Sequence, residues 1–594
     1  MGDDKKLAYD FQGEVKQMIK KLFSYSGKYK KFLGFAAACA ALEAMIELLI
    51  PLVMAKIVDE AIPSQNMSYT VKLGIMMVCM ALVSFTFGIL LSKFAAAAGQ
   101  GLGANLRQAE FEKIQKYSFK NIEKFSTASL ITRLTTDITA VQNSVTMGVK
   151  LLVRAPVMLI FAIVLSIRIS RELAVIFAIT LPILIISIGT LVKKVGPLFG
   201  IMQKRVDNMN TLVQENLIGV RVVKSFVRAE KEKEKFQKGN EELKETASKS
   251  FGLMVLSMPI MQLVIFSSII AILWFGGHMV YADTLTVGKL TSFIAYSTQI
   301  LVSLMLVAMA LMIISRSIAS AKRIIEVLEE EPDIADGEKN VSNVKNGDIE
   351  FKNVSFKYED DSDEYNLENI SLNIKSGETI GIIGGTGSAK TSLVQLIPRL
   401  YDANNGEIYV GGVNVKDYSI ETLRSEVAMV LQKNTLFSGS IIDNLRWGDE
   451  NATMEEIEEA CKIACVDEFI DRLPGKYDMD LGQGGVNVSG GQKQRLCIAR
   501  AILKKPKVLI LDDSTSAVDT ATDAKIRRAF REDLKDTTKI IIAQRINSVC
   551  DADKIIVMDD GKISAIGTHD ELMESSEIYI DVYNSQQEGA GLRE

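Results

Sequence analysis

The chain has 594 residues, enough for several domains, and 48% of them are apolar, which indicates that part of the chain lies in lipid. Its formal net charge of −5 is too small to indicate nucleic-acid binding. Six scattered cysteines and only two histidines, His278 and His569, indicate reduced thiols in a cytosolic domain rather than a zinc site.

The first residues predict a helix that lies in the membrane interface. Val15, Met18, Ile19, Leu22 and Phe23 repeat at helical spacing, whereas lysines take the opposite face. A helix packed on protein is the alternative for this stretch. No short apolar region followed by a small-residue cleavage site is present, so we expect no cleavable signal peptide.

Six stretches have the roughly 20 mostly apolar residues that a membrane span needs. Lys150 and Arg154 interrupt the start of the third. Long polar segments follow the second and the fourth span, and apart from GQGLG at 99–103 and Pro197 they contain few helix breakers. We therefore expect helices that extend far beyond the membrane. The six spans cover residues 33–57, 73–98, 147–167, 173–192, part of 251–282, and 290–315.

The lysine distribution predicts the orientation. Eight lysines precede the first span, and the positive-inside rule places that end in the cytosol. Arg168 and Arg171, in an outward loop, oppose this mildly. Six spans return the chain to its starting side. We therefore expect a multi-pass protein of the plasma (inner) membrane, with both termini and the second half of the chain in the cytoplasm.

The first and the last two spans carry candidate substrate-binding side chains. Glu43 and Glu47 lie four residues apart and share one helix face. Carboxylates inside a membrane are costly and usually face a cavity or a partner. They would favour cationic or amphipathic substrates; the alternative is an interhelical pair, for instance with Arg154. Methionine stripes suit varied ligands, but plain packing is the simpler interpretation. The stripes are Met254, Met258, Met261, Met305, Met309 and Met312.

The second half of the chain alternates strands and helices, which predicts an α/β domain. The strand TIGII runs into a glycine-rich loop, and a helix follows. Such a loop surrounds phosphates with backbone N–H groups, Lys390 reaches the terminal phosphates, and Thr391 reaches Mg²⁺. Ala389 stands where the pattern has glycine, and its Cβ crowds the loop. The predicted nucleotide-binding residues here are Gly384, Gly385, Thr386, Gly387, Ser388, Ala389, Lys390, Thr391 and Ser392.

Two later motifs add to this prediction. Ser489, Gly490, Gly491 and Gln492 would place backbone donors and a hydroxyl at a helix N-terminus, which suits phosphate binding. Further on, VLILDDSTSAVD at 508–519 begins with an apolar strand that ends in two carboxylates. Many nucleotide hydrolases use such a strand to hold Mg²⁺ and to aim a water molecule.

Together these features resemble a half-transporter of the ATP-binding cassette (ABC) exporter family over nearly the full chain. The resemblance implies an all-α transmembrane domain of six helices with long cytosolic extensions, followed by an α/β P-loop ATP-binding cassette domain that uses ATP and Mg²⁺. Its bounds would be 1–31 for an interfacial elbow helix, 32–325 for the transmembrane domain, 326–346 for a linker, 347–582 for the nucleotide-binding domain and 583–594 for a tail.

The resemblance also implies roles for single residues. Tyr358 is similar to the aromatic residue that stacks on adenine, Gln432 to the glutamine that touches Mg²⁺, and Asp512 to the Mg²⁺ aspartate. Residues 489–492 match the signature, and 516–519 the turn that communicates across the dimer. Short coupling helices are expected near 118–127 and 218–227, in grooves near Gln432. His569 is expected to make a local structural hydrogen bond.

Three positions depart from the family pattern. Asp513 stands where the family has its catalytic Glu, Gln544 where it has a His that contacts the γ-phosphate, and Ala389 where it has Gly. A shorter carboxylate aligns the attacking water poorly, and a neutral amide cannot become cationic. Because loss of one activating contact commonly costs about 10²–10³-fold in rate, we expect very slow turnover. Tolerated drift in an active site is the alternative.

The intact signature favours a heterodimer. In this family two cassettes close head to tail, so residues 489–492 would complete the competent site of a partner that carries Glu and His. The chain resembles the degenerate half of heterodimeric bacterial multidrug exporters, which are ATPase-coupled translocases of hydrophobic or amphipathic compounds. A lipid or peptide exporter subunit, a mainly regulatory nucleotide-sensing subunit, and a homodimeric exporter are the alternatives.

Overall fold

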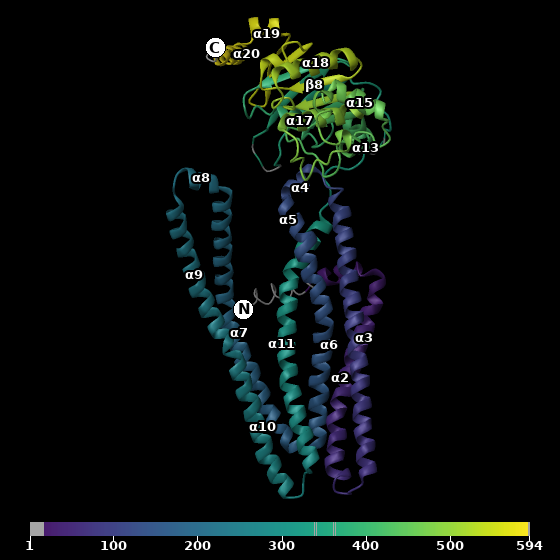
Figure 1. Cartoon of the computed structure of the whole chain (residues 1–594), viewed down its shortest axis with the longest axis vertical. Coiled ribbons are helices and arrows are strands. Elements are labelled where there is room, and N and C mark those ends of the chain that lie inside the picture. Colours follow the sequence, from purple (N-terminus) through teal and green to yellow (C-terminus); the bar gives the residue numbers. More distant parts are fainter. Residues whose placement is uncertain are drawn as a thin grey trace. The chain divides into compact units, whose positions relative to one another are not determined.

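The computed structural model describes Gly13 and residues 17–337, 339, 341–359, 362 and 364–591. The chain divides into two compact units (Figure 1). The helical unit comprises Met1–Lys113 and Ala128–Glu329, and the sheet unit comprises Ile114–Thr127 and Glu330–Glu594.

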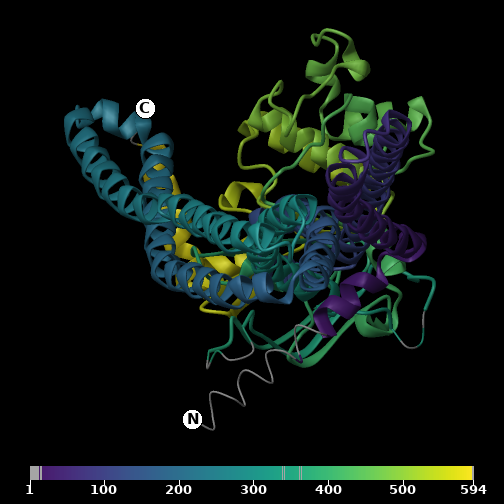
Figure 2. The same ribbon diagram turned by 90° about the horizontal axis from the view of Figure 1, so that it is seen from below.

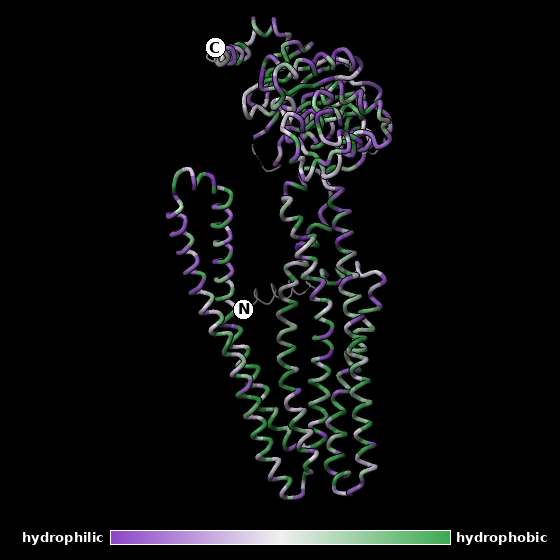
Figure 3. The backbone as a smooth tube through the Cα atoms, in the orientation of Figure 1, coloured by the Kyte–Doolittle hydropathy of each residue, from purple (hydrophilic) through white to green (hydrophobic). Residues whose placement is uncertain are grey.

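The described residues of the helical unit form six helices that are long and apolar enough to cross a membrane, as the sequence predicts. Apolar residues predominate along the end of these helices that lies away from α8, whereas polar residues predominate along α8 and α9 (Figure 3). At 1.5 Å per residue the 48 residues of α3 extend over roughly 70 Å, more than twice the hydrocarbon thickness of a bilayer. The helices are α2 (Lys30–Lys56), α3 (Met67–Ile114), α6 (Ile138–Ile169), α7 (Arg171–Ile218), α10 (Ser257–Tyr281) and α11 (Val287–Glu329).

Helix α3 runs without a break through the GQGLG segment at 99–103, which we expected to act as a helix breaker. A Cβ atom at Gly99 would lie 2.0 Å from Thr146 Oγ1, and one at Gly103 would lie 2.5 Å from Gln142 Oε1. These glycines therefore let α3 approach α6 closely. Likewise, α7 continues as a helix through Pro197.

The described part of the N-terminal amphipathic stretch packs on protein. Residues 17–24 are helical. Leu22 is buried in a cluster with Leu102 and Leu106 of α3, Ile138 of α6 and residues of α11, and Met18 packs against the same cluster. Ile19 is exposed. One face of this helix therefore packs on protein, which was the alternative to a helix in the membrane interface. Val15 lies outside the described residues.

Helices α7 and α9 (Ala229–Val255) form a hairpin around the short helix α8 (Val220–Ser225). The hairpin diverges from the other helices toward α8 in both views (Figures 1 and 2). The structure describes every residue of the hairpin, and the only buried ones are Leu173, Phe177, Leu184 and Ser250. Its tip exposes apolar side chains: Leu217, Ile218, Val222, Phe226 and Val227.

The sheet unit is built on a six-stranded sheet of order β10-β9-β3-β8-β7-β6, in which β10 alone is antiparallel to its neighbour. Its strands are β3 (Thr379–Gly384), β6 (Val427–Val430), β7 (Val508–Asp512), β8 (Thr538–Ile542), β9 (Lys554–Asp559) and β10 (Lys562–Gly567). A second, antiparallel sheet has the order β2-β1-β4-β5. It contains β1 (Ile349–Phe356), β2 (Leu367–Ile374), β4 (Asn405–Val410) and β5 (Val413–Asn414).

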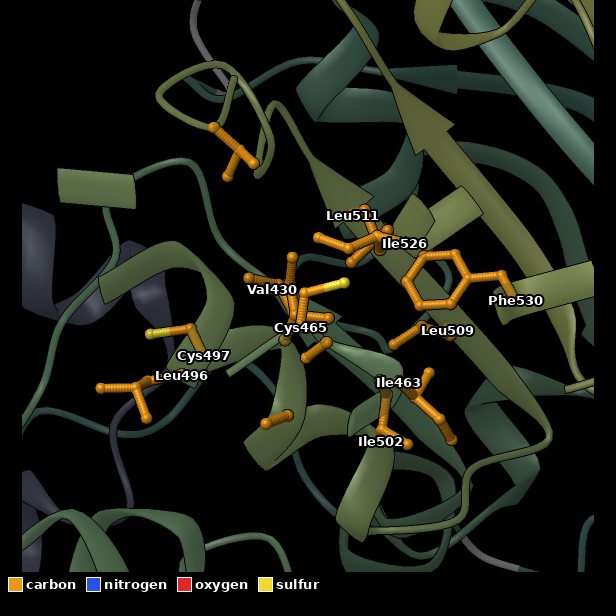
Figure 4. Close-up of a cluster of buried hydrophobic side chains, with 14 of the residues drawn as sticks. Val430, Ile463, Cys465, Leu496, Cys497, Ile502, Leu509, Leu511, Ile526 and Phe530 are labelled. Atoms are coloured by element: carbon orange, nitrogen blue, oxygen red, sulfur yellow. The ribbon is translucent and has the colours of Figure 1, made fainter. Parts of the chain in front are cut away.

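Strand β7 is buried on both faces, which fits its four consecutive apolar residues before Asp512. Leu509 and Leu511 point into a cluster with side chains of neighbouring helices, including Ile526 and Phe530 (Figure 4). Val508 and Ile510 pack on the opposite side, in a cluster with strands of the antiparallel sheet. From residue 390 onward the α-helices of this unit are α12 (Lys390–Gln395), α13 (Ile420–Glu426), α14 (Ile441–Leu445), α15 (Met454–Ile463), α16 (Asp467–Ile470), α17 (Gly490–Leu503), α18 (Thr520–Asp533), α19 (His569–Ser575) and α20 (Glu577–Gly591).

Two expected boundaries differ from the structure. Helix α11 continues to Glu329, so the first residues of the expected linker at 326–346 are helical. Helix α20 continues to Gly591 and takes in most of the segment that we expected to be a tail, 583–594. Short helices α4 (Phe119–Phe125) and α5 (Thr127–Thr132) and a π-helical turn, Arg133–Asp137, precede α6.

Candidate nucleotide-binding site

The predicted site residues follow four parallel strands of the six-stranded sheet. Strand β3 leads into the glycine-rich loop, β6 leads to Gln432, β7 ends at Asp512, and β8 leads to Gln544. These strands run parallel to one another, so their carboxyl ends lie at one edge. Open α/β sheets bind ligands at this edge.

The glycine-rich loop holds Lys390 by several contacts. The Lys390 Nζ atom donates to the carbonyl oxygens of Gly384 at 2.9 Å and Gly385 at 2.6 Å, and to Ser388 Oγ at 3.2 Å. Burial lowers the pKa of the lysine, and the carboxylates of Asp512 and Asp513 oppose this effect. The cation therefore lies within the loop, where phosphate oxygens can replace the carbonyls.

Thr391 and Asp512, the two predicted Mg²⁺ ligands from these motifs, lie in contact. The Thr391 hydroxyl donates to Asp512 Oδ1 at 3.0 Å. Burial raises the pKa of Asp512, and the charge of Asp513 adds to the rise. Two hard oxygen donors fit a Mg²⁺ ion that takes its other ligands from water and nucleotide phosphates. Among the described residues no group of three or more His, Cys, Asp or Glu side chains could hold a metal ion on its own.

Asp513 and Gln544 form a direct pair. Gln544 Nε2 donates to Asp513 Oδ2 at 2.7 Å. Burial raises the pKa of Asp513, while hydrogen bonds from Gln432 and Gln544 and the charge of Lys390 lower it. The structure therefore brings the side chains of Gln432 and Gln544 to the carboxylate of Asp513. All three residues are predicted from the sequence.

Ala389 and Asp513 both have left-handed backbone. Their φ angles are 64° and 49°. A non-glycine residue in this region costs roughly 1–2 kcal/mol. The problem at Ala389 is therefore conformational, in addition to the crowding that we expected from its Cβ.

Tyr358 lies beside the helix that follows the loop. Its hydroxyl shares a hydrogen bond of 2.9 Å with Ser392 Oγ and donates to Gln395 Oε1 at 3.3 Å. Its ring meets the rings of Phe356 and Tyr401 edge-on. Burial raises the pKa of the phenol. Tyr358 is thus near the phosphate loop, and its stacking on adenine stays a prediction.

The predicted signature caps helix α17. Ser489 Oγ accepts from the Gln492 N–H at 3.3 Å, and Gln492 Oε1 accepts from the Ser489 N–H at 2.8 Å. This capping box leaves Ser489 and Gly490 exposed. Gln494, which the sequence analysis missed, holds the neighbouring turn by accepting from the Ala517 N–H at 3.0 Å. Its only sequence signal is its place on the signature helix.

The segment expected as the first coupling helix is α4, and it packs within the sheet unit. Tyr401 donates to Glu123 Oε1 at 3.0 Å, and Asn121 donates to Glu330 Oε1 at 3.1 Å. Phe119 lines a cavity of about 330 Å³ with Leu431 and other residues that flank Gln432. The second expected segment, 218–227, contains α8.

In the helical unit, Arg154 of α6 contacts both membrane carboxylates of α2. Its guanidinium lies 2.6 Å from Glu47 Oε2 and 3.5 Å from Glu43 Oε1. The interhelical pair is therefore present. Glu43 Oε2 is buried without a hydrogen-bond partner among the described residues.

The other two predictions concern local packing. Met261 and Met305 lie in one apolar cluster, whereas Met254, Met258 and Met309 are exposed. The side chain of Met312 lies outside what the structure describes. His569 Nδ1 shares a hydrogen bond of 2.7 Å with the Tyr579 hydroxyl, which confirms its local structural contact.

Comparisons with known proteins agree with this architecture. Residues 33–304 match the model of the ABC transporter transmembrane region, and residues 367–516 match the ABC transporter model. An uncharacterized ABC transporter ATP-binding protein of Bacillus subtilis, YfiB, is 40% identical, with 96% of this chain and 98% of that protein aligned. YknU of the same organism, also described as uncharacterized, is 33% identical, with 96% of this chain and 97% of that protein aligned.

A solved structure shows the same fold. The structure of a bacterial Atm1-family ABC exporter with ATP bound has a TM-score of 0.79 and 23% identity, and the alignment covers 94% of this chain and 99% of that one. The expected fold class is thereby confirmed: six membrane-crossing helices followed by an ATP-binding cassette, in the exporter arrangement. From the relatives and the two matched regions together, we conclude that the chain belongs to the ABC transporter family.

Proposed function

We propose that the chain is one subunit of a heterodimeric exporter of hydrophobic or amphipathic compounds, and that it binds MgATP but hydrolyses it very slowly. Its intact signature completes the ATP site of a partner with Glu and His at the positions corresponding to Asp513 and Gln544. Both termini and the sheet unit lie in the cytoplasm, and the six long apolar helices α2, α3, α6, α7, α10 and α11 cross the plasma (inner) membrane. Lipid or peptide export by the same engine is the second possibility for the cargo.

The hydrogen bond between Gln544 and Asp513 is the observation that carries this proposal. At 2.7 Å the amide occupies a lone pair of the carboxylate that would have to orient water. Asp513 is one methylene shorter than Glu, and Gln544 cannot take up positive charge as γ-phosphate charge develops. The two altered residues satisfy each other, which supports nucleotide binding without efficient chemistry.

The exposed hairpin tip supports a dimer. Ile218 is 78% exposed, Phe226 72% and Val227 85%, although they lie well past the apolar part of α7. Solvent-exposed apolar patches of this kind mark interaction surfaces. A second half-transporter would cover the tip.

The triad of Glu43, Glu47 and Arg154 supports a cationic cargo. One guanidinium faces two carboxylates, so one negative charge is in excess. An uncompensated carboxylate in a membrane domain favours a cation or a proton. Glu43 carries the excess, because its Oε2 atom has no partner among the described residues.

Restoring the family residues tests the proposal of slow hydrolysis. The double variant Asp513→Glu, Gln544→His is expected to raise ATP turnover by the purified chain about 10²-fold or more, because both activating groups return. Asp536→Glu, an exposed carboxylate of the same unit, is the matched control and should leave turnover unchanged. Brisk turnover by the unaltered chain, with no gain in the double variant, contradicts the proposal.

The cargo class has a separate test. Glu43→Gln removes the excess charge and keeps the 2.6 Å pair between Glu47 and Arg154. Efflux of a monocationic dye such as ethidium from cells with both subunits should fall about tenfold, while efflux of a neutral hydrophobic dye changes by less than about twofold. Equal loss for both dyes would show a packing role instead.

A further inference from the structure

Helix α20, whose second half lies in the segment 583–594 that the sequence analysis assigns to a tail, is anchored to the core of the sheet unit. Tyr579 is fully buried, and its hydroxyl contacts His569 Nδ1. Ile578, Val582 and Tyr583 pack against the large apolar cluster that also contains Leu509 and Leu511 of β7. The position of α20 relative to the sheet is therefore fixed by packing.

One side chain of α20 binds the backbone on both sides of Arg545. Gln586 Nε2 donates to the Gln544 carbonyl at 2.9 Å, and Gln586 Oε1 accepts from the Ile546 N–H at 2.9 Å. A primary amide has one donor end and one acceptor end, and both are used here. Gln586 thus binds the three-residue segment 544–546 at both of its ends, Gln544 and Ile546.

The same segment carries the amide that meets Asp513. Gln544 receives the Gln586 contact on its carbonyl and donates from its side chain to Asp513 Oδ2. A cavity of about 630 Å³ is lined by Asp513 and Gln544 together with Ser585 and Gln586. Helix α20 therefore forms a wall of the space that opens onto the Asp513 carboxylate.

The geometry points to Gln586 as a positioning residue of the ATP site: by binding the backbone of Gln544 and Ile546, it holds the Gln544 amide where it reaches Asp513 and the terminal phosphate. This rests on the proposed function only in assigning Asp513 and Gln544 to bound ATP. It does not require that hydrolysis is slow. Both amide atoms of Gln586 are used on the backbone of Gln544 and Ile546, so it acts on the site through Gln544.

Binding of a fluorescent, non-hydrolysable ATP analogue with Mg²⁺ to the full chain tests this inference. Gln586→Met keeps the shape of the side chain and removes both hydrogen bonds. It should weaken the affinity and speed release by about three- to tenfold, the range that two hydrogen bonds allow. Gln586→Glu keeps the acceptor for Ile546 and loses the donor, so it should fall between. Gln587→Met, the same change at the exposed neighbouring residue, should have no effect.

A double-mutant cycle separates positioning from mere support of α20. In a Gln544→Ala background the side chain through which Gln586 acts is gone, so Gln586→Met should no longer alter affinity. An equal effect in both backgrounds, or unchanged affinity with a lower melting temperature, overturns the inference. If Gln586→Met does not fold, Gln586→Glu in the same cycle decides. Brisk ATP turnover by the unaltered chain would refute the slow-site proposal and leave this result intact.

Discussion

Two regions of the sheet unit differ in backbone and side chains: the phosphate-loop face, made of residues 384–392 with Asp513 and Gln544, and the signature face, made of residues 489–492. Ala389 and Asp513 on the first have positive φ angles, and Asp513 and Gln544 depart from the family pattern. Ser489 on the second has a φ angle of −70° and a complete capping box. Left-handed backbone and departures from the family pattern therefore occur together on the phosphate-loop face, whereas residues 489–492 of the signature show neither.

This difference indicates which property is retained. Left-handed residues persist only where the surrounding structure enforces them, so the loop keeps the shape needed to bind phosphate even without its glycine. Lys390, Thr391 and Asp512 also keep their contacts. Two of the three changes, Asp513 and Gln544, affect groups that would act on water and the γ-phosphate. Under the proposed function, nucleotide binding and hydrolysis would then be separable in this chain.

The signature face gives the largest expected effect. A Cβ at Gly491 would lie 2.8 Å from the Ala517 carbonyl, so Gly491→Val would displace the signature from its turn. We expect ATP turnover of the proposed heterodimer to fall about 10²-fold or more, because the site that the signature would complete in the partner loses phosphate contacts. Nucleotide affinity of this chain alone should change by less than about twofold. Steady-state turnover and equilibrium binding check both, and loss of binding would show that the two faces are not independent.

Lys390→Ala should give the opposite pattern. Loss of a charged hydrogen-bond donor to phosphate is expected to weaken nucleotide binding by this chain about 10- to 100-fold. Turnover at the partner's site should fall less than it does for Gly491→Val. Titration of the same fluorescent ATP analogue measures the nucleotide affinity of this chain. Lys535→Ala, at an exposed lysine, is the control. Equal loss of heterodimer turnover in both variants would argue against one competent site.

Ala389→Gly should have the smallest effect. Glycine adopts a φ angle of 64° without strain, so the folded state gains about 1 kcal/mol, partly offset by the larger entropy of the unfolded chain. The melting temperature should rise by a few degrees at most, and nucleotide affinity should improve up to about fivefold. A drop in both would mean that the Ala389 Cβ makes a favourable contact in the loop.

The sequence predicted the elements that depend on local pattern. Apolar length predicted the six spans, the strand–loop–helix order predicted Lys390 and Thr391, and an apolar strand that ends in two carboxylates pointed to Asp512, which the structure places in contact with Thr391. Contacts between segments that are distant in the chain could not be predicted from local sequence pattern. The glycines at 99–103 resemble helix breakers in the sequence, whereas in the structure Gly99 and Gly103 allow close contact with α6. Gln586 lies in a polar stretch without periodicity, and only the packing of α20 brings it to Gln544.

ATP turnover by the purified chain alone, with nucleotide binding measured on the same sample, tests the central claim most directly. The account predicts saturable MgATP binding and turnover below about 0.01 s⁻¹, at least about 10²-fold under the lower end of the 1–10³ s⁻¹ range of ordinary enzymes. Turnover of about 1 s⁻¹ or more would contradict it. Asp513 and Gln544 would then suffice for hydrolysis, and a homodimeric exporter would be the better account.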